Sequence, residues 1–200
     1  NTTRHLALGG YVTPAMHAII DYYSATTTGN AADFGDMTDG RAHLGGLCSS
    51  VRVVSLGGDS PGLSEIMDYV TIASTGDATD FGDLTLARAT GTGANSTTRG
   101  LYIGGSSPTG SNVIDYITIA SAGDAADFGD TTQARTTSGG ANSLTRAVVA
   151  GGVGVPSGTF YDIIDYVTIA STGDAADFGD LKATRAEFAG CSNCHGGIYG

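Results

Sequence analysis

The sequence predicts an all-β protein built from about four repeats of 47–50 residues. The first observation is composition, because glycine supplies 32 of the 200 residues while Glu, Lys and Gln, which favour helices, are scarce. The second is an Ile-Asp-Tyr or Met-Asp-Tyr step, whose aspartate returns at spacings of 47, 47 and 50 residues at Asp21, Asp68, Asp115 and Asp165. The third is Asp-Phe-Gly-Asp, which follows each step at 33–36, 80–83, 127–130 and 177–180. Repeats of this period are supersecondary units that bury their apolar faces by stacking on their neighbours.

Each repeat predicts about four short strands, and the third repeat shows them in order. An apolar run that begins at Arg99 ends at the glycine pair 104–105, and a polar loop follows. Residues 113–121 form a strand rich in β-branched residues, with one face more apolar than the other. Residues 127–130 form a compact turn, and a strand of small residues through 139–140 leads into the next repeat.

The predicted units span approximately residues 4–51, 52–98, 99–145 and 146–195. Their equivalence predicts a shared core, in which the side chains of one isoleucine and one phenylalanine per repeat are almost fully buried. These residues are Ile72, Ile119 and Ile169, together with Phe81, Phe128 and Phe178.

Both ends of the chain fall inside a unit, and the chain opens at Asn1 without an initiator methionine. We therefore expect a fragment of a longer protein or an open array of four units. Bare strand edges template association, so we also expect them to be covered. Ring closure would bring Leu6 and Leu8 against Ile169, whereas assembly would place the edges between chains.

An apolar strand ending in Gly-Gly, a variable loop, a strand containing Tyr, a Phe turn and then Arg is similar to the kelch motif. The resemblance covers the whole chain and implies that each unit is a four-stranded blade of a β-propeller. Kelch repeats usually carry Trp where this chain has Phe34, Phe81, Phe128 and Phe178. The phrase at 164–181 also resembles kelch-like repeats in structural proteins of marine bacteriophages, which implies a virion-surface or tail-fibre module.

The net charge of −11 argues against nucleic acid or an anionic membrane surface as partner, because both attract basic patches. No apolar run approaches the ~18 residues that a membrane-spanning helix needs. The resemblance implies instead a location on the virion surface or outside the cell. The partner would be a cell-surface glycan, another virion protein or another copy of the chain.

The loop between the glycine pair and the Asp-Tyr step varies most, and it holds the one length change, three extra residues in the fourth repeat. A rigid frame that carries variable loops is typical of a recognition surface. The candidate binding residues on these loops are Tyr11, His17, Asp59, Ser107, Asn112, Phe160 and Tyr161.

Aspartates spaced by three residues around the Phe turn are candidate calcium ligands, since Ca²⁺ prefers oxygen donors. They are Asp77, Asp80 and Asp83, then Asp124, Asp127 and Asp130, then Asp174, Asp177 and Asp180, with Asn30, Asp33 and Asp36 in the first repeat. The alternative, which we favour, is that these side chains cap turns by accepting backbone hydrogen bonds. No cofactor is favoured, although mutual repulsion of the carboxylates leaves calcium open.

Cys191, Cys194 and His195 match the spacing of c-type haem attachment. The alternative is a pair of thiols on an ordinary repeat strand, because small polar residues occupy this strand in the other repeats. A Soret band in the purified protein would separate the two interpretations.

The sequence contains no strong pattern of catalytic residues. The enzymatic alternative is a kelch-type oxidase, whose copper site needs His and Tyr ligands, and the four histidines fall at different places in the repeat and offer no such site. We expect a protein that is not an enzyme. The two arginines of each repeat are expected to pair with the aspartate of the Asp-Tyr step or of the turn, and so to hold neighbouring units in register.

Overall fold

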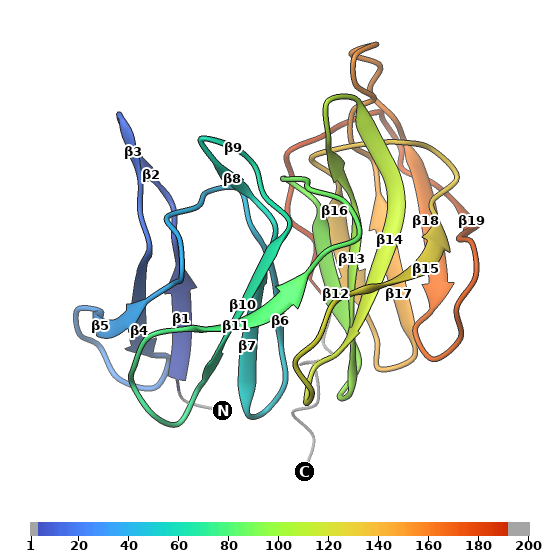
Figure 1. Cartoon of the computed structure of the whole chain (residues 1–200). Coiled ribbons are helices and arrows are strands. Elements are labelled where there is room, and N and C mark those ends of the chain that lie inside the picture. The colour runs from blue at the N-terminus through green and yellow to red at the C-terminus, as the bar shows by residue number, and fades with distance from the viewer. Residues whose placement is uncertain (1–3, 192–200) are drawn as a thin grey trace.

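The computed structural model describes residues 4–191, which form strands, turns and loops and contain no helix in that range. Four antiparallel sheets follow one another along the chain (Figure 1), and the strands of each sheet are hydrogen-bonded in sequence order. Two small hairpins project from the first and second sheets. The all-β prediction is therefore confirmed for the described residues.

The first sheet has three strands, β1 (Arg4–Leu8), β4 (Ile19–Ser24) and β5 (Ala32–Asp36). The second contains β6 (Gly45–Cys48), β7 (Arg52–Leu56), β10 (Ile66–Thr71) and β11 (Thr79–Asp83). The third contains β12 (Thr92–Asn95), β13 (Arg99–Ser106), β14 (Gly110–Thr118) and β15 (Ala126–Asp130). The fourth contains β16 (Gly139–Asn142), β17 (Arg146–Ala150), β18 (Ile163–Thr168) and β19 (Ala176–Asp180). The hairpins pair β2 (Tyr11–Val12) with β3 (Ala15–Met16) and β8 (Asp59–Ser60) with β9 (Gly62–Leu63).

The sheets are offset from the predicted repeat units. The strand of small residues starts a sheet instead of ending one, because a tight turn joins it to the strand that follows. In that turn the Ser96 amide donates to the Arg99 carbonyl at 2.9 Å, and β12 pairs with β13 from Thr92 opposite Ile103 onward. The longer connection before β12 instead carries the chain from one sheet to the next.

Apolar cores lie between consecutive sheets. One core joins Phe81 of the second sheet to Ile117 and Ile119 of the third, and another joins Phe128 of the third to Val167 and Ile169 of the fourth. The predicted burial is confirmed for five of the six residues, namely Ile72, Ile119, Ile169, Phe81 and Phe128.

Phe178 contradicts the prediction of equivalent burial, because 55% of its surface is exposed. Its ring meets Tyr166 edge-on at 5.8 Å, as Phe128 meets Tyr116 at 6.0 Å, so its local conformation follows the repeat. The difference is that β19 ends the fourth sheet and no further sheet of the described chain covers it.

Glycine is required where neighbouring sheets meet. Gly57 has a φ of +56°, and a Cβ on it would lie 2.4 Å from the Arg88 carbonyl oxygen. A Cβ on Gly82 would lie 2.5 Å from the backbone of Gly123 in the next sheet. A side chain at Gly82 would push two sheets apart, whereas one at Gly57 would displace the backbone that leads from the second sheet to the third.

Of the two alternatives for the chain ends, ring closure through Leu6 and Leu8 against Ile169 is not formed within residues 4–191. Leu6 and Leu8 pack in the core around Ile20 and Phe34, whereas Ile169 belongs to the core between the third and fourth sheets. Figure 1 shows the first and fourth sheets at opposite ends of the row, because each sheet packs on the one that follows it in sequence.

Candidate functional site

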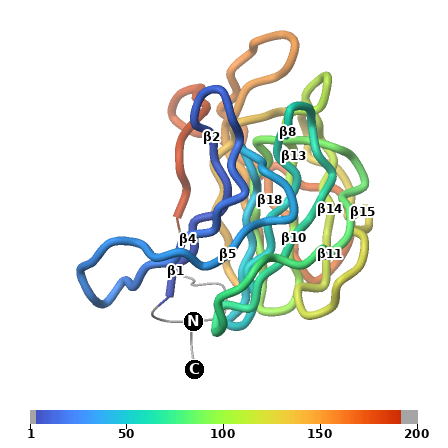
Figure 2. The backbone as a smooth tube through the Cα atoms, turned by 60° about the vertical axis from the view of Figure 1, so that its left-hand side comes forward, coloured from blue at the N-terminus to red at the C-terminus, as the bar shows by residue number. Residues whose placement is uncertain are grey.

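The variable loops lie together at one end of the sheets. The β2–β3 hairpin, the β8–β9 hairpin, the β13–β14 turn and the segment 151–162 all project from the same end in Figures 1 and 2. The reason is topological, because each loop follows the equivalent strand of its sheet (β1, β7, β13 or β17) and parallel placement of the sheets aligns these strand ends. The loop surface is therefore formed by segments from four sheets.

The most exposed candidate binding residues are aromatic and lie on the outer two sheets. Tyr11 in the β2–β3 hairpin is 54% exposed, and Phe160 in the fourth loop is 55% exposed. Tyr161, next to Phe160, is half-buried, and its backbone amide donates to the Gly152 carbonyl at 2.9 Å. Aromatic rings held on short loops present rigid apolar faces to a partner.

The candidate binding residues on the third sheet are less accessible to a partner. Ser107 is buried, and its hydroxyl donates to the Thr109 carbonyl within its own loop. Asn112 is half-buried, and its carbonyl accepts the Thr131 amide at 2.8 Å. The seven predicted residues therefore follow the loop surface as a row and do not converge on one pocket.

One polar contact on this surface was not predicted from the sequence. The Nδ1 atom of His43 lies 2.9 Å from Oδ1 of Asp59, and 59% of the His43 side chain is exposed. The two residues meet because the backbones of Ala42 and Asp59 exchange a pair of hydrogen bonds. Sixteen residues separate them, so only the pairing of the two segments could have indicated the contact.

A groove of about 370 Å³ begins beneath the first hairpin. Two of the predicted residues, Tyr11 and His17, line its upper part, and the groove continues down the outer face of the first sheet to Asp21. The groove thus brings the candidate loop residues Tyr11 and His17 beside Asp21, an acidic side chain of the repeated frame.

The Asp-Phe-Gly-Asp segments, predicted as compact turns, are instead strands (β5, β11, β15 and β19), because each pairs with the preceding strand of its sheet. Their aspartates accept backbone hydrogen bonds: Asp127 Oδ1 accepts the Gly129 amide at 3.3 Å within β15, whereas Asp124 Oδ1, in the loop before β15, accepts the Asp83 amide of the preceding sheet at 3.1 Å. The described residues contain no group of three or more His, Cys, Asp or Glu side chains placed to hold a metal ion. The geometry favours turn capping over the calcium interpretation.

In the first three repeats one arginine pairs with the aspartate of the next Asp-Tyr step, as expected. Arg88 Nη1 lies 3.0 Å from Asp115 Oδ2, and neither side chain is exposed. Thr85 Oγ1 donates to the other oxygen of Asp115 at 2.5 Å, so the buried carboxylate is fully partnered. The same link forms between Arg41 and Asp68 and between Arg135 and Asp165.

Within residues 4–191 the other arginine of each repeat does not pair with a carboxylate. Arg52 stacks over the Tyr69 ring at 4.3 Å and donates to the Ile119 carbonyl of the next sheet at 3.2 Å. The expected ion pair is therefore replaced here by a cation–π contact and a backbone hydrogen bond that also join neighbouring sheets.

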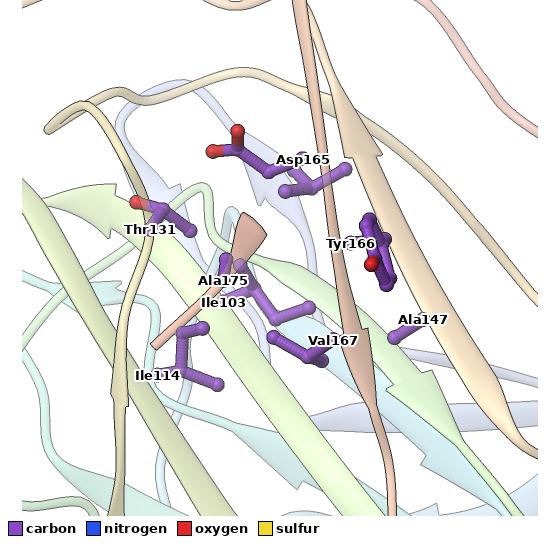
Figure 3. Close-up of a pocket in the computed structure, with 9 residues that line it drawn as sticks. Ile103, Ile114, Thr131, Ala147, Asp165, Tyr166, Val167 and Ala175 are labelled. Atoms are coloured by element: carbon purple, nitrogen blue, oxygen red, sulfur yellow. The ribbon is translucent and has the colours of Figure 1, made fainter. Parts of the chain in front are cut away.

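A pocket between the third and fourth sheets, shown in Figure 3, is lined mainly by apolar side chains, with Asp165 and Thr131 at one side. It leaves no room for a water molecule. This pocket is the packed contact between two sheets and not a ligand site.

The haem prediction lies largely outside the described residues, which include Cys191 but neither Cys194 nor His195. Cys191 is exposed and carries a free thiol. Between residues 4 and 191 no helix is long and apolar enough to cross a membrane.

No protein-family model matches the chain, and no curated protein matches it either. The loop surface and the repeated frame therefore carry the functional argument by themselves.

Proposed function

We propose that the chain is a non-catalytic recognition module, in which the four sheets are blades of a kelch-like β-propeller and the loop surface binds the partner. The kelch-like pattern and the alignment of four similar sheets support the propeller. The resemblance to phage structural proteins supports a virion or tail fibre as the location of such a module and a cell-surface glycan or another virion protein as its partner.

The observation that carries the proposal is the contrast between frame and loops. The buried Arg–Asp pairs and the buried phenylalanines of the cores recur from sheet to sheet, while exposed aromatic side chains occur on the loops that vary. Aromatic faces beside polar groups suit sugars, because the C–H face of a sugar packs on the ring while its hydroxyls find hydrogen-bond partners. The scattered histidines give no comparable support to an enzyme.

Binding to a panel of cell-surface glycans, measured with the purified chain, tests this function. Tyr11→Ala and Phe160→Ala should each weaken binding at least tenfold without unfolding the protein. Leu144→Ala is the matched control, since Leu144 is 44% exposed in the turn before β17, at the opposite end of the strand that leads to the Phe160 loop. If all three variants bind alike, or if no glycan and no virion protein binds, the loop surface is not the recognition site.

A further inference from the structure

The three contacts between consecutive sheets use one repeated set of links. The amide of Gly123 donates to the Phe81 carbonyl at 2.6 Å, and the amide of Ala125 donates to the Asp83 carbonyl at 2.8 Å. Both links recur between the first and second sheets and between the third and fourth. Each contact between sheets also contains a buried Arg–Asp ion pair and the buried phenylalanine of the Asp-Phe-Gly-Asp segment, which packs in the core between the two sheets.

The arginine in each contact enters a socket on the next sheet. Arg41 donates to the carbonyls of Gly57 and Ile66 at 2.6 Å, and its guanidinium meets Asp68 at 2.5 Å. It also lies 3.2 Å from the hydroxyl of Ser55. The planar guanidinium has five fixed N–H donors, so this cluster of acceptors is specific for arginine.

The first sheet carries the same socket without an arginine. The groove on its outer face is lined by Ala7, Gly9, Ile19 and Asp21, which occupy the positions of Ser55, Gly57, Ile66 and Asp68. The amide of Gly9 donates to the Ile19 carbonyl at 2.9 Å, just as that of Gly57 donates to Ile66 at 3.0 Å. Asp21 has no side-chain partner among residues 4–191.

The fourth sheet carries the arginine without a socket. Arg185 is the counterpart of Arg135, and its carbonyl accepts the Gly152 amide at 2.8 Å as that of Arg135 accepts Gly105 at 3.0 Å. Its side chain is exposed, stacks over Phe188 at 5.0 Å and meets no carboxylate of the described chain. Lys182, also exposed, occupies the position from which Thr132 reaches Asp165.

The two end faces also expose complementary groups. Phe178 is exposed on the fourth sheet, and Tyr23 occupies on the first sheet the position of Val167, which packs against Phe128 in the core between the third and fourth sheets. Tyr23 and the neighbouring Ile19 are each 46% exposed. The face of the fourth sheet therefore carries a cation and an exposed phenyl ring. The face of the first sheet carries a carboxylate and exposed apolar side chains that could pack on that ring.

We propose that the groove at Asp21 is an arginine socket and that Arg185 of a second copy of this chain fills it, so that copies associate head to tail. Phe178 of one copy then packs against Tyr23 of the other, and the Asp21 carboxylate gains the cation that every internal counterpart has. This association goes beyond recognition by the loops, because its ion pair joins Asp21 and Arg185 of the sheets, although Tyr11 and His17 line the same groove.

A head-to-tail interface joins different surfaces, so it either closes a ring or propagates. Two copies contribute eight sheets, which lies within the ~4 to 8 blades of closed propellers. A pair that closes leaves neither end face exposed and satisfies both sockets. We therefore expect a dimer of twice the 20.0 kDa chain mass.

Charge reversal with mixing tests the proposal, with mass measured by sedimentation equilibrium. Arg185→Asp alone and Asp21→Arg alone each place like charges at both interfaces of a homodimer, and each should raise the dissociation constant more than about tenfold. An equimolar mixture of the two variants should restore the dimer, because one interface is then native and the other carries the reversed pair. Glu65→Arg, on an exposed loop away from both end faces, is the charge control and should associate like the unaltered chain.

Circular dichroism and the double variant Asp21→Arg/Arg185→Asp guard against misfolding, since the double variant is again self-complementary and should dimerise. A monomeric unaltered chain overturns the proposal. So does a single variant that dimerises normally, or a mixture that stays monomeric while the double variant is compact, since that result assigns the socket to the arginine of the same chain.

Discussion

Residues 126–130 and 176–180 have the same sequence, Ala-Asp-Phe-Gly-Asp, and form equivalent strands, β15 and β19. Phe128 is 3% exposed and Phe178 is 55% exposed. Both rings keep the edge-on contact with the tyrosine of their own sheet, at interplanar angles of 76° and 77°. The local structure of the repeat is therefore set within one sheet, whereas burial depends on the sheet that follows.

The arginines show the same contrast. Arg135 is buried against Asp165, while Arg185, in the equivalent position, is exposed. Removing one partner of a buried pair leaves an uncompensated charge, so the inner sheets depend on each other strongly. The end sheets carry the same residues, but there these residues do not pack against a further sheet. A substitution at an end position is therefore a matched control for the same substitution at an internal position.

The largest expected difference is between the two phenylalanines. Phe128→Ala should lower the free energy of unfolding by about 3–5 kcal/mol, because it leaves a cavity between two sheets. Phe178→Ala should cost only about 1–2 kcal/mol, since 55% of its surface stays in water and its removal leaves no enclosed cavity. Urea unfolding in the Asp21→Arg background, where the end faces repel, gives both values. Equal losses would show that the Phe178 ring is covered in solution.

The stacked arginines should show a smaller difference. Arg99 lies over Tyr116 at 4.6 Å and also donates to the Ile169 carbonyl at 3.0 Å, so Arg99→Ala should cost about 2 kcal/mol. Arg146 lies over Tyr166 at 4.4 Å with no further sheet to reach, and Arg146→Ala should cost about 0.5–1 kcal/mol. Thermal unfolding at fixed pH compares them, and a larger loss for Arg146 would contradict the role of the link between sheets.

The turn aspartates provide a third comparison. Asp124→Ala removes the acceptor for the Asp83 amide and should cost about 1 kcal/mol. Asn30 occupies the same position in the first sheet, where no preceding sheet needs capping, so Asn30→Ala should change stability by less than about 0.5 kcal/mol. Chelator should leave the melting temperature of the unaltered chain unchanged. A fall with chelator would instead restore the calcium interpretation.

The smallest expected effect is that of Tyr102 ionisation on the free energy of unfolding, which appears only at alkaline pH. Burial raises the pKa of Tyr102, whose ring packs between the second and third sheets. Because the unfolded chain ionises first, near pH ~10, the stabilisation from neutral Tyr102 is present below that pH and is lost as the pH rises through the higher pKa of the folded state. Stability against urea should therefore fall above about pH 10, and Tyr102→Phe should flatten this fall. An equally steep fall in the variant would assign it to another group.

The sequence by itself determined the features that repeat. The period of the Asp-Tyr step predicted four similar units, and composition predicted strands in place of helices. The recurrence of Arg and Asp predicted the buried pairs, of which Arg88 with Asp115 is an example. These predictions succeed because strand propensity and side-chain alternation act over a few residues, so equal segments adopt equal local structures.

Only the tertiary structure decided which copy of each feature is satisfied. It paired the small-residue strand with the strand after it, buried Phe128 but not Phe178, and left Asp21 and Arg185 without the partners that their internal counterparts have. In a stack of repeats each unit contacts only its neighbours, so burial and ion pairing belong to the junction between two units. Identical residues at a junction and at an end therefore have different environments, and sequence identity alone does not distinguish them.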